Sequence, residues 1–214
     1  VGRTAVAGAT RAFDVERNLQ LAISAIERQD FGVADQHLQQ VELQAPDLAE
    51  AWYHRAVLNW WLSRDTDGPA TRALAGNLDA AERGFMEGLR LVTNQSHLTP
   101  AIEHFRALVE QFPDHRDIQY GLFEALYHGG YAREAMVVYR RLCGSHPRFR
   151  LGLKHALATS IGRADEGEMS WVIARLDPQA ADSALWQARA LVARRAFAGA
   201  TPLQRRHDTP DEAA

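Results

Sequence analysis

The residues in this chain whose types could carry out chemistry are nine histidines and one cysteine. His97 and His104 are seven residues apart, a spacing that puts both side chains on one face of a helix. No two histidines have the four-residue spacing around a glutamate that a helical zinc peptidase site needs. We therefore interpret the pair as surface residues and predict no metal site.

A thiol and an imidazole lie three residues apart in the segment Cys143-Gly-Ser-His146. Nucleophilic catalysis also needs a third group that orients the imidazole, and none is evident. Because the segment falls where a helix is expected to end, we interpret it as a structural turn. No glycine-rich phosphate loop, serine elbow or paired carboxylate signature is present. The sequence thus predicts no catalytic residue, no cofactor and no enzymatic activity.

Charge and composition narrow the classes of partner. The net charge is −3, which gives no overall basic field for nucleic acid. The pairs Arg194-Arg195 and Arg205-Arg206 are interpreted as surface residues that favour solubility. No run approaches the ~20 apolar residues that cross a bilayer, and residues 1–14 lack the apolar run of a signal peptide. We expect no membrane insertion and a cytoplasmic location, with a periplasmic one after signal removal left open.

A repeat with a period of 34 residues must position any binding surface. Pro46, Pro113 and Pro147 each follow an amphipathic run and are separated by 67 and 34 residues. Three further sets of residues have the same separations of 67 and 34 and so occupy equivalent positions in the repeats. One set is alanine and two are large apolar residues: Ala34, Ala101 and Ala135; Leu38, Phe105 and Tyr139; Val41, Leu108 and Leu142. Two helices per period, ended by proline, indicate an array of helical hairpins. The alanines are expected to lie where paired helices pack closely.

The repeats resemble the tetratricopeptide repeat family, most clearly in the run from Asp117 to Tyr127 and in Gly130, Ala135 and Pro147. Ala22, Asp30-Phe31 and Ala34 carry the resemblance in the first repeat, and Ala51-Trp52-Tyr53 in the second. The resemblance implies an all-α fold, a right-handed α-solenoid of helix-turn-helix hairpins. The repeats are expected at 15–48, 49–81, 82–115 and 116–149, and the usage of arginine and alanine is typical of a bacterial protein.

The second repeat departs from the pattern after Trp61, where Arg64 to Pro69 is a turn signal. Either a short helix follows and the phase continues, or 63–76 is a long loop. Both alternatives stay open.

The ends of the chain lack the period. Residues 1–14 are expected to be flexible, and 200–214 to be a disordered tail. Between the repeats and the tail, 150–199 should form a degenerate repeat and a capping helix that turns Trp186 and Leu191 inward.

The family's first helices line a concave groove, so the resemblance implies a protein or peptide partner there. Six residues are predicted to contact it: Tyr53, Trp60, Arg90, Tyr120, Glu124 and Tyr127. The leading interpretation is a non-enzymatic scaffold or adaptor of undetermined oligomeric state. One alternative is a regulatory or substrate-recruiting segment of a larger bacterial transferase, hydroxylase or protease. Another is a small-peptide sensor with a deep pocket near Trp60 and Tyr127.

Overall fold

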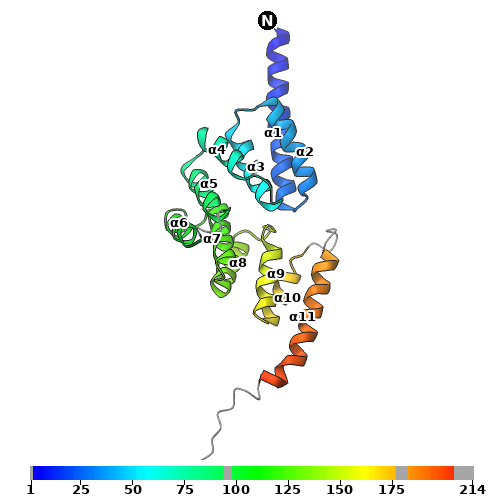
Figure 1. Ribbon diagram of the computed structural model, residues 1–214. Helices are drawn as coiled ribbons and strands as arrows, with labels where there is room; N and C mark the ends of the chain where they lie inside the picture. The colour runs from blue at the N-terminus through cyan, green and yellow to red at the C-terminus, as the bar shows by residue number, and fades with distance from the viewer. Residues whose placement is uncertain (1, 94–97, 177–182, 205–214) are drawn as a thin grey trace, which may run out of the picture. The chain divides into compact units, whose positions relative to one another are not determined.

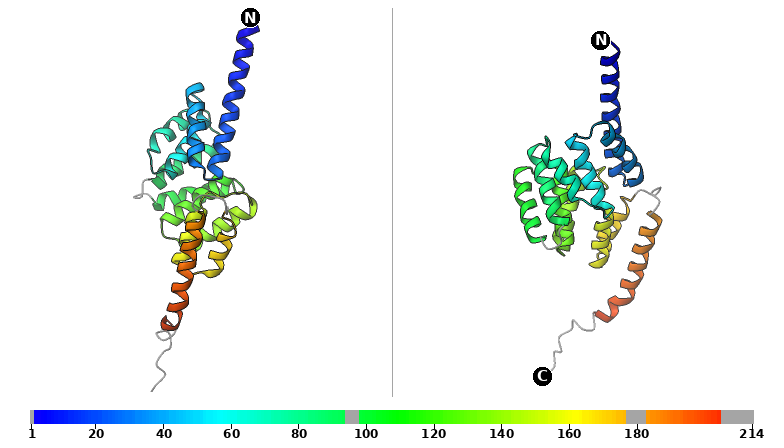
Figure 2. Two further views of the ribbon diagram at one scale, coloured as in Figure 1. Left: turned by 90° about the vertical axis from the view of Figure 1, so that its right-hand side faces the viewer. Right: turned by 45° about the horizontal axis from the view of Figure 1, so that its top comes forward.

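A computed structural model describes residues 2–93, 98–176 and 183–204, all of whose regular structure is helical (Figures 1 and 2). The chain divides into two compact units, 1–151 and 152–214. The first unit contains α1 (Gly2–Glu27), α2 (Phe31–Gln44), α3 (Ala49–Trp61), α4 (Asp67–Ala75), α5 (Ala80–Thr93), α6 (Leu98–Gln111), α7 (Arg116–His128) and α8 (Ala132–Ser145). The second contains α9 (Leu153–Gly162), α10 (Glu166–Ile173) and α11 (Ser183–Gln204).

The helices of the first unit pair as four successive hairpins, which confirms the all-α fold class, while the bounds of the four repeats stay a prediction. The residues of the three repeated sets form the core between the helices: Ala34, Ala101, Ala135, Leu38, Phe105, Tyr139, Val41, Leu108 and Leu142 are all buried. Alanine at the closest approach of two helices lets their backbones come together, and the larger residues fill the space to the next hairpin.

A second set of equivalent positions marks the turn inside four of the hairpins, while the turn between α5 and α6 lies outside the described residues. Gln29, Ser63, Gly130 and Ala164 all have positive φ, between 53° and 81°. The residue after each donates its backbone N–H to the carbonyl five residues earlier, as in Tyr131 to Leu126 at 2.9 Å. This is the Schellman ending of a helix, which satisfies carbonyls that have no partner within the helix. The turn at Ala164 shows that α9 and α10 form a fifth hairpin in the same 34-residue phase.

The open question in the second repeat is resolved in favour of a short helix. α4 begins at Asp67, where the Asp65 side chain accepts hydrogen bonds from the N–H groups of Asp67 and Gly68, at 3.1 and 3.3 Å. Helix α4 buries Ala70 and Ala73. The 34-residue phase therefore continues through the degenerate repeat.

The expected flexible segment at 1–14 is instead part of α1, which begins at Gly2. Its first part projects past the end of α2 (Figures 1 and 2). An alanine-rich segment without proline favours helix, and the Arg11 guanidinium donates to the carbonyl of Gln44 at the end of α2.

In the second unit, α11 is the expected capping helix, but Leu191 is 56% exposed rather than inward. The inward face carries Ala190 and Ala193, while Trp186 is half-buried. The helix continues to Gln204, and 205–214, most of the predicted tail, lies outside the described residues.

Two glycines set how closely α5 and α7 approach the Phe105 ring on α6. A Cβ atom built on Gly88 would lie 2.4 Å from that ring, and one built on Gly121 would lie 2.2 Å from it. Real Cβ atoms do not come so near to another atom, so only glycine fits at both positions. Phe105 is completely buried between them.

Gly121→Ala should lower the free energy of unfolding by about 1–3 kcal/mol, because overpacking a filled core has that cost. The matched control is Gly144→Ala in α8, where an added Cβ meets no atom within 4 Å. The control should be neutral or slightly stabilising, since alanine favours helix more than glycine does. Urea unfolding of both variants checks this, and equal stability would show that the ring can move aside.

Candidate functional site

The structure separates the six residues predicted to contact a partner into two groups. Tyr53, Tyr120 and Glu124 are buried, with 3%, 1% and 1% of their surface exposed. The expectation that these three lie on an open surface is therefore corrected. They fill the space between first helices, where large side chains are needed to pack α3, α5 and α7 together.

The other three predicted residues remain accessible. Trp60 and Tyr127 are half-buried, and Arg90 is exposed. The Arg90 guanidinium pairs with Asp67 at the start of α4, with Nε 2.6 Å from the carboxylate oxygen. Because both side chains are substantially exposed, this ion pair contributes little stability. Whether the three accessible residues contact a partner stays a prediction.

The first helices are tied together across the groove by a polar cluster around Asp117 on α7. Its carboxylate accepts a hydrogen bond from the Tyr53 hydroxyl of α3 at 2.7 Å and one from Arg116 Nε at 2.8 Å. Arg116 also donates to Glu27 at the end of α1. One cluster thus joins the first, second and fourth hairpins, a contact that sequence spacing alone did not indicate.

Burial and these charges shift the ionisation of the cluster. Burial alone would raise the pKa of Asp117, but Arg116 and the hydrogen bond from Tyr53 outweigh it and lower that pKa. The pKa of Tyr53 is raised well above its ordinary value by burial and by the Asp117 charge. Burial lowers the pKa of neighbouring His54 to about 4. At neutral pH the Asp117 carboxylate is therefore charged, and the His54 ring is neutral.

The segment after α8 closes the same groove. Phe149 and Leu151 are buried, and the Phe149 ring meets the Tyr120 ring at 5.4 Å between centroids. The Gln29 side chain donates to the Arg150 carbonyl at 2.7 Å. The space left between the first helices is a cavity of about 30 Å³, lined by residues that include Ile23, Val57, Phe85, Tyr120 and Phe149.

A cavity of that size holds only one or two water molecules. Neither Trp60 nor Tyr127 lines this cavity, so the small-peptide sensor with a deep pocket near those two residues stays a prediction.

A continuous row of aromatic rings lies above this closed groove, at the ends of α3 and α7. The Phe31 ring of α2 stacks on Trp61 at 5.9 Å, Trp61 meets Trp60 at 5.8 Å, and Trp60 meets His128 at 6.1 Å. Tyr127 meets His128 at 4.9 Å. All five rings are half-buried or exposed. We call Phe31, Trp60, Trp61, Tyr127 and His128 the aromatic edge.

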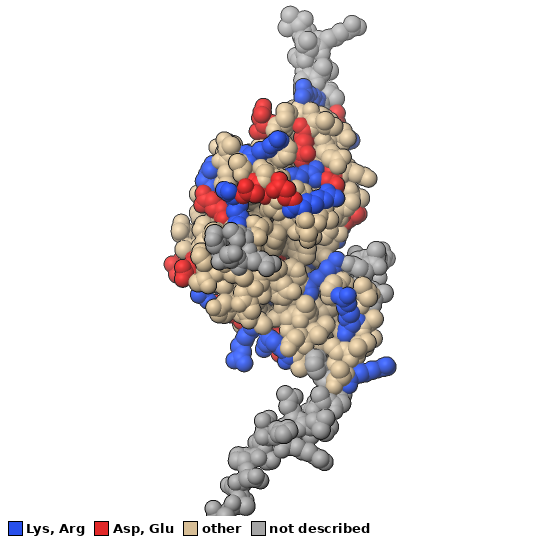
Figure 3. Space-filling view, in the orientation of Figure 1, with Lys and Arg blue, Asp and Glu red and all other residues tan. Residues whose placement is uncertain are grey.

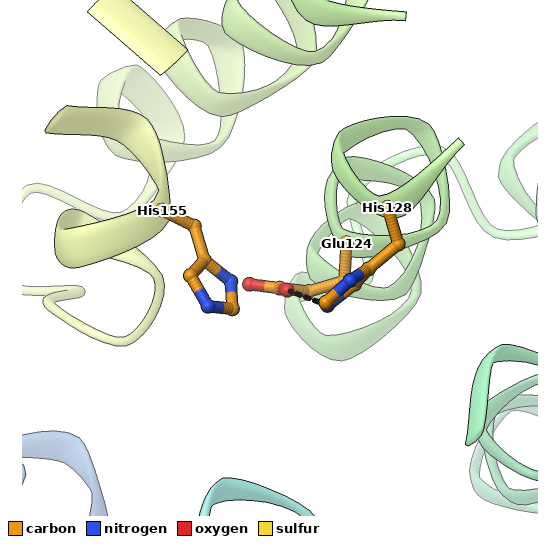
Figure 4. A group of neighbouring side chains, drawn as sticks. All are labelled: Glu124, His128 and His155. Carbon is orange, nitrogen blue, oxygen red and sulfur yellow. Dashed lines mark ion pairs between the residues drawn. The ribbon is translucent and has the colours of Figure 1, made fainter. Parts of the chain in front are cut away.

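Glu124 lies one turn before His128 on α7, and its carboxylate oxygen is 3.7 Å from the His128 Nε2 (Figure 4). The buried carboxylate thus lies beside an exposed ring of the aromatic edge. His155, drawn in the same figure, belongs to α9 of the second unit.

The side chains with a candidate role in catalysis or metal binding, Cys143, His146 and His104, lie in the helical framework. Cys143 is buried in α8, and His146 is the residue that ends this helix, as the turn interpretation expected. His104 contacts the carbonyl of Gly84 at 2.8 Å through Nε2, while His97 lies outside the described residues. The absence of a metal site, a cofactor and catalysis stays a prediction.

The lowered pKa of His54 makes stability depend on pH. The unfolded chain takes up a proton near the ordinary pKa of about 6.5, whereas the folded protein resists protonation down to about 4. Acid therefore favours the unfolded state, and the free energy of unfolding should fall by about 2 kcal/mol between pH 7 and pH 5. Urea unfolding at the two pH values measures this, with His54→Gln as the variant expected to lose most of the dependence. An equal dependence in both proteins would contradict a neutral His54.

No helix in the described part of the chain combines the length and the apolar character needed to cross a membrane.

Part of the sequence, and the fold, are similar to those of known proteins. Residues 85–148, which span most of α5 and all of α6 to α8, match the family model of the tetratricopeptide repeat. No curated protein matches the sequence closely enough to count as a relative. A similar fold occurs in the crystal structure of PilW, described as a widely conserved type IV pilus biogenesis factor, with a TM-score of 0.51 and 19% identity over 92% of this chain and 96% of that one. The family match identifies residues 85–148 as tetratricopeptide repeats, and the 34-residue period extends the same hairpin pattern over the other described repeats.

Proposed function

We propose that this protein is a non-enzymatic scaffold that binds a protein or peptide partner at the aromatic edge. The observation that carries the proposal is the row of five accessible rings in mutual contact across α2, α3 and α7. Large rings with a polar atom bury much area at low entropic cost, which is why they dominate binding hot spots. Rings held by one another and by Glu124 lose little further freedom when a partner binds.

The closure of the groove also favours binding at the aromatic edge. The concave surface that an extended peptide could enter is occupied by Phe149 and Leu151 and crossed by the Asp117 cluster. Within the described part of the first unit, a partner can therefore reach the ends of the first helices without displacing other residues, whereas it would have to separate three hairpins to reach the groove.

The comparisons add support at the level of architecture. Tetratricopeptide repeats are arrays whose extended surfaces suit protein binding. PilW, which shares the fold, is described as a biogenesis factor, and a role in assembling other proteins suits a scaffold. Recruitment of substrates within a larger enzyme would use the same surface.

Replacing Trp60 or Tyr127 by alanine should weaken partner binding about thirtyfold, since truncating a hot-spot ring costs ~2 kcal/mol. The partner is first captured by a photoreactive phenylalanine analogue placed at position 127. Its affinity for each alanine variant is then measured by calorimetry with the purified proteins. The melting temperature should change little, because both rings are only half-buried.

The matched control is Val137, which is 64% exposed on α8. The analogue at position 137 should capture nothing, and Val137→Ala should bind as tightly as the parent. If position 137 captures the same partner and the two ring variants bind normally, the partner uses the second-helix face and the proposal is wrong.

A further inference from the structure

The terminal helix α11 presents an apolar outer face that the described chain does not cover. Leu185, Leu191 and Val192 are exposed, by 54%, 56% and 68%. Ala188 and Ala196 are exposed as well. Leu185 and Val192 are two turns apart and share one side of the helix. A capping helix normally turns a polar face outward. We therefore expect another molecule to cover this apolar face.

The charges on α11 are all of one sign. Its sequence contains three arginines and no aspartate or glutamate. Arg189 and Arg195 are exposed beside the apolar residues. Arg189 stacks over the Trp186 ring at 4.7 Å, and Arg194 contacts the Ser170 hydroxyl of α10. On the face seen in Figure 3, the charged side chains over α11, at the lower right, are basic.

We infer that α11 is a peripheral membrane contact, in which Leu185 and Val192 enter the lipid interface and Arg189 and Arg195 bind anionic headgroups. An apolar stripe flanked by arginines, without acidic residues, has the charge complementary to an anionic lipid surface. Long arginine side chains keep their charge at the headgroups while their stems cover apolar surface. A single convex helix also fits a flat, deformable surface without needing a matching pocket in a partner protein.

This contact is separate from the aromatic edge, since it uses α11 alone. It involves no insertion of a spanning helix and needs no overall positive charge, because the arginines act within a Debye length of the surface. Arg205 and Arg206 follow α11 directly in the sequence and have the same sign.

The test is co-sedimentation of the full chain with vesicles of phosphatidylcholine, alone or with about a third phosphatidylglycerol. The protein should sediment with the anionic vesicles and stay in solution with the neutral ones, and salt should release it. The double variant Arg189→Gln, Arg195→Gln should bind about thirtyfold more weakly, each arginine contributing about fivefold. The double variant Leu185→Asp, Val192→Asp should lose binding altogether.

Val137→Asp is the control, since it adds one aspartate at a valine of the first unit that is about as exposed as Val192. It should bind vesicles nearly as the parent does, and circular dichroism should show all variants equally helical. The inference is overturned if the parent stays in solution with anionic vesicles, or if the control loses binding as completely as the α11 variants. It is also overturned if light scattering finds a dimer that Leu185→Asp, Val192→Asp dissolves, because a second copy then covers the face.

Discussion

The architecture of the first unit depends on one largely buried carboxylate. Asp117 accepts a hydrogen bond from Tyr53 and one from Arg116, and Arg116 holds Glu27 at the end of α1. A charge taken out of water is costly unless it is paired and hydrogen-bonded. The cluster meets that condition only when the first, second and fourth hairpins are all in place. Asp117 therefore links these three hairpins through its two partners, Tyr53 and Arg116, and through the bond from Arg116 to Glu27.

The closure of the groove between the first helices determines which surfaces of the first unit a partner can reach. With Phe149 and Leu151 packed against the first helices, the concave face becomes an interior with a cavity of about 30 Å³. Accessible apolar surface is left at the aromatic edge of the first unit and on the outer face of α11 in the second. One is built from rings that contact one another, and the other from aliphatic side chains flanked by arginine. Their different chemistry is the reason for assigning them different partners.

The sequence predicted most of the fold because hairpin packing repeats locally. Ala34, Ala101 and Ala135 have the same neighbours in each hairpin, so one period places all three. The sequence did not predict the equivalent turn positions, because glycine occupies one of the four, Gly130. Gln29, Ser63 and Ala164 also have positive φ at the other three. Within the candidate site, Trp60 and Tyr127 are half-buried in the structure, and their contact with a partner stays a prediction. Tyr53 and Tyr120 were not predicted to be buried, since a tyrosine on a first helix has the same spacing whether it faces solvent or another hairpin. What buries Tyr53 is Asp117, 64 residues away, and no local pattern encodes that contact.

The cross-groove contacts also bear on how the first unit folds and unfolds. In an open solenoid each repeat contacts only its neighbours, so the ends can fray while the middle persists. Here Gln29 bonds to Arg150, and Glu27 to Arg116, at separations of 121 and 89 residues. Such contacts make the first hairpin depend on the fourth as well as on the second. The array therefore gains the all-or-none cooperativity of a globular domain, and the loop that must close before those contacts form makes its folding slower than its helical composition suggests.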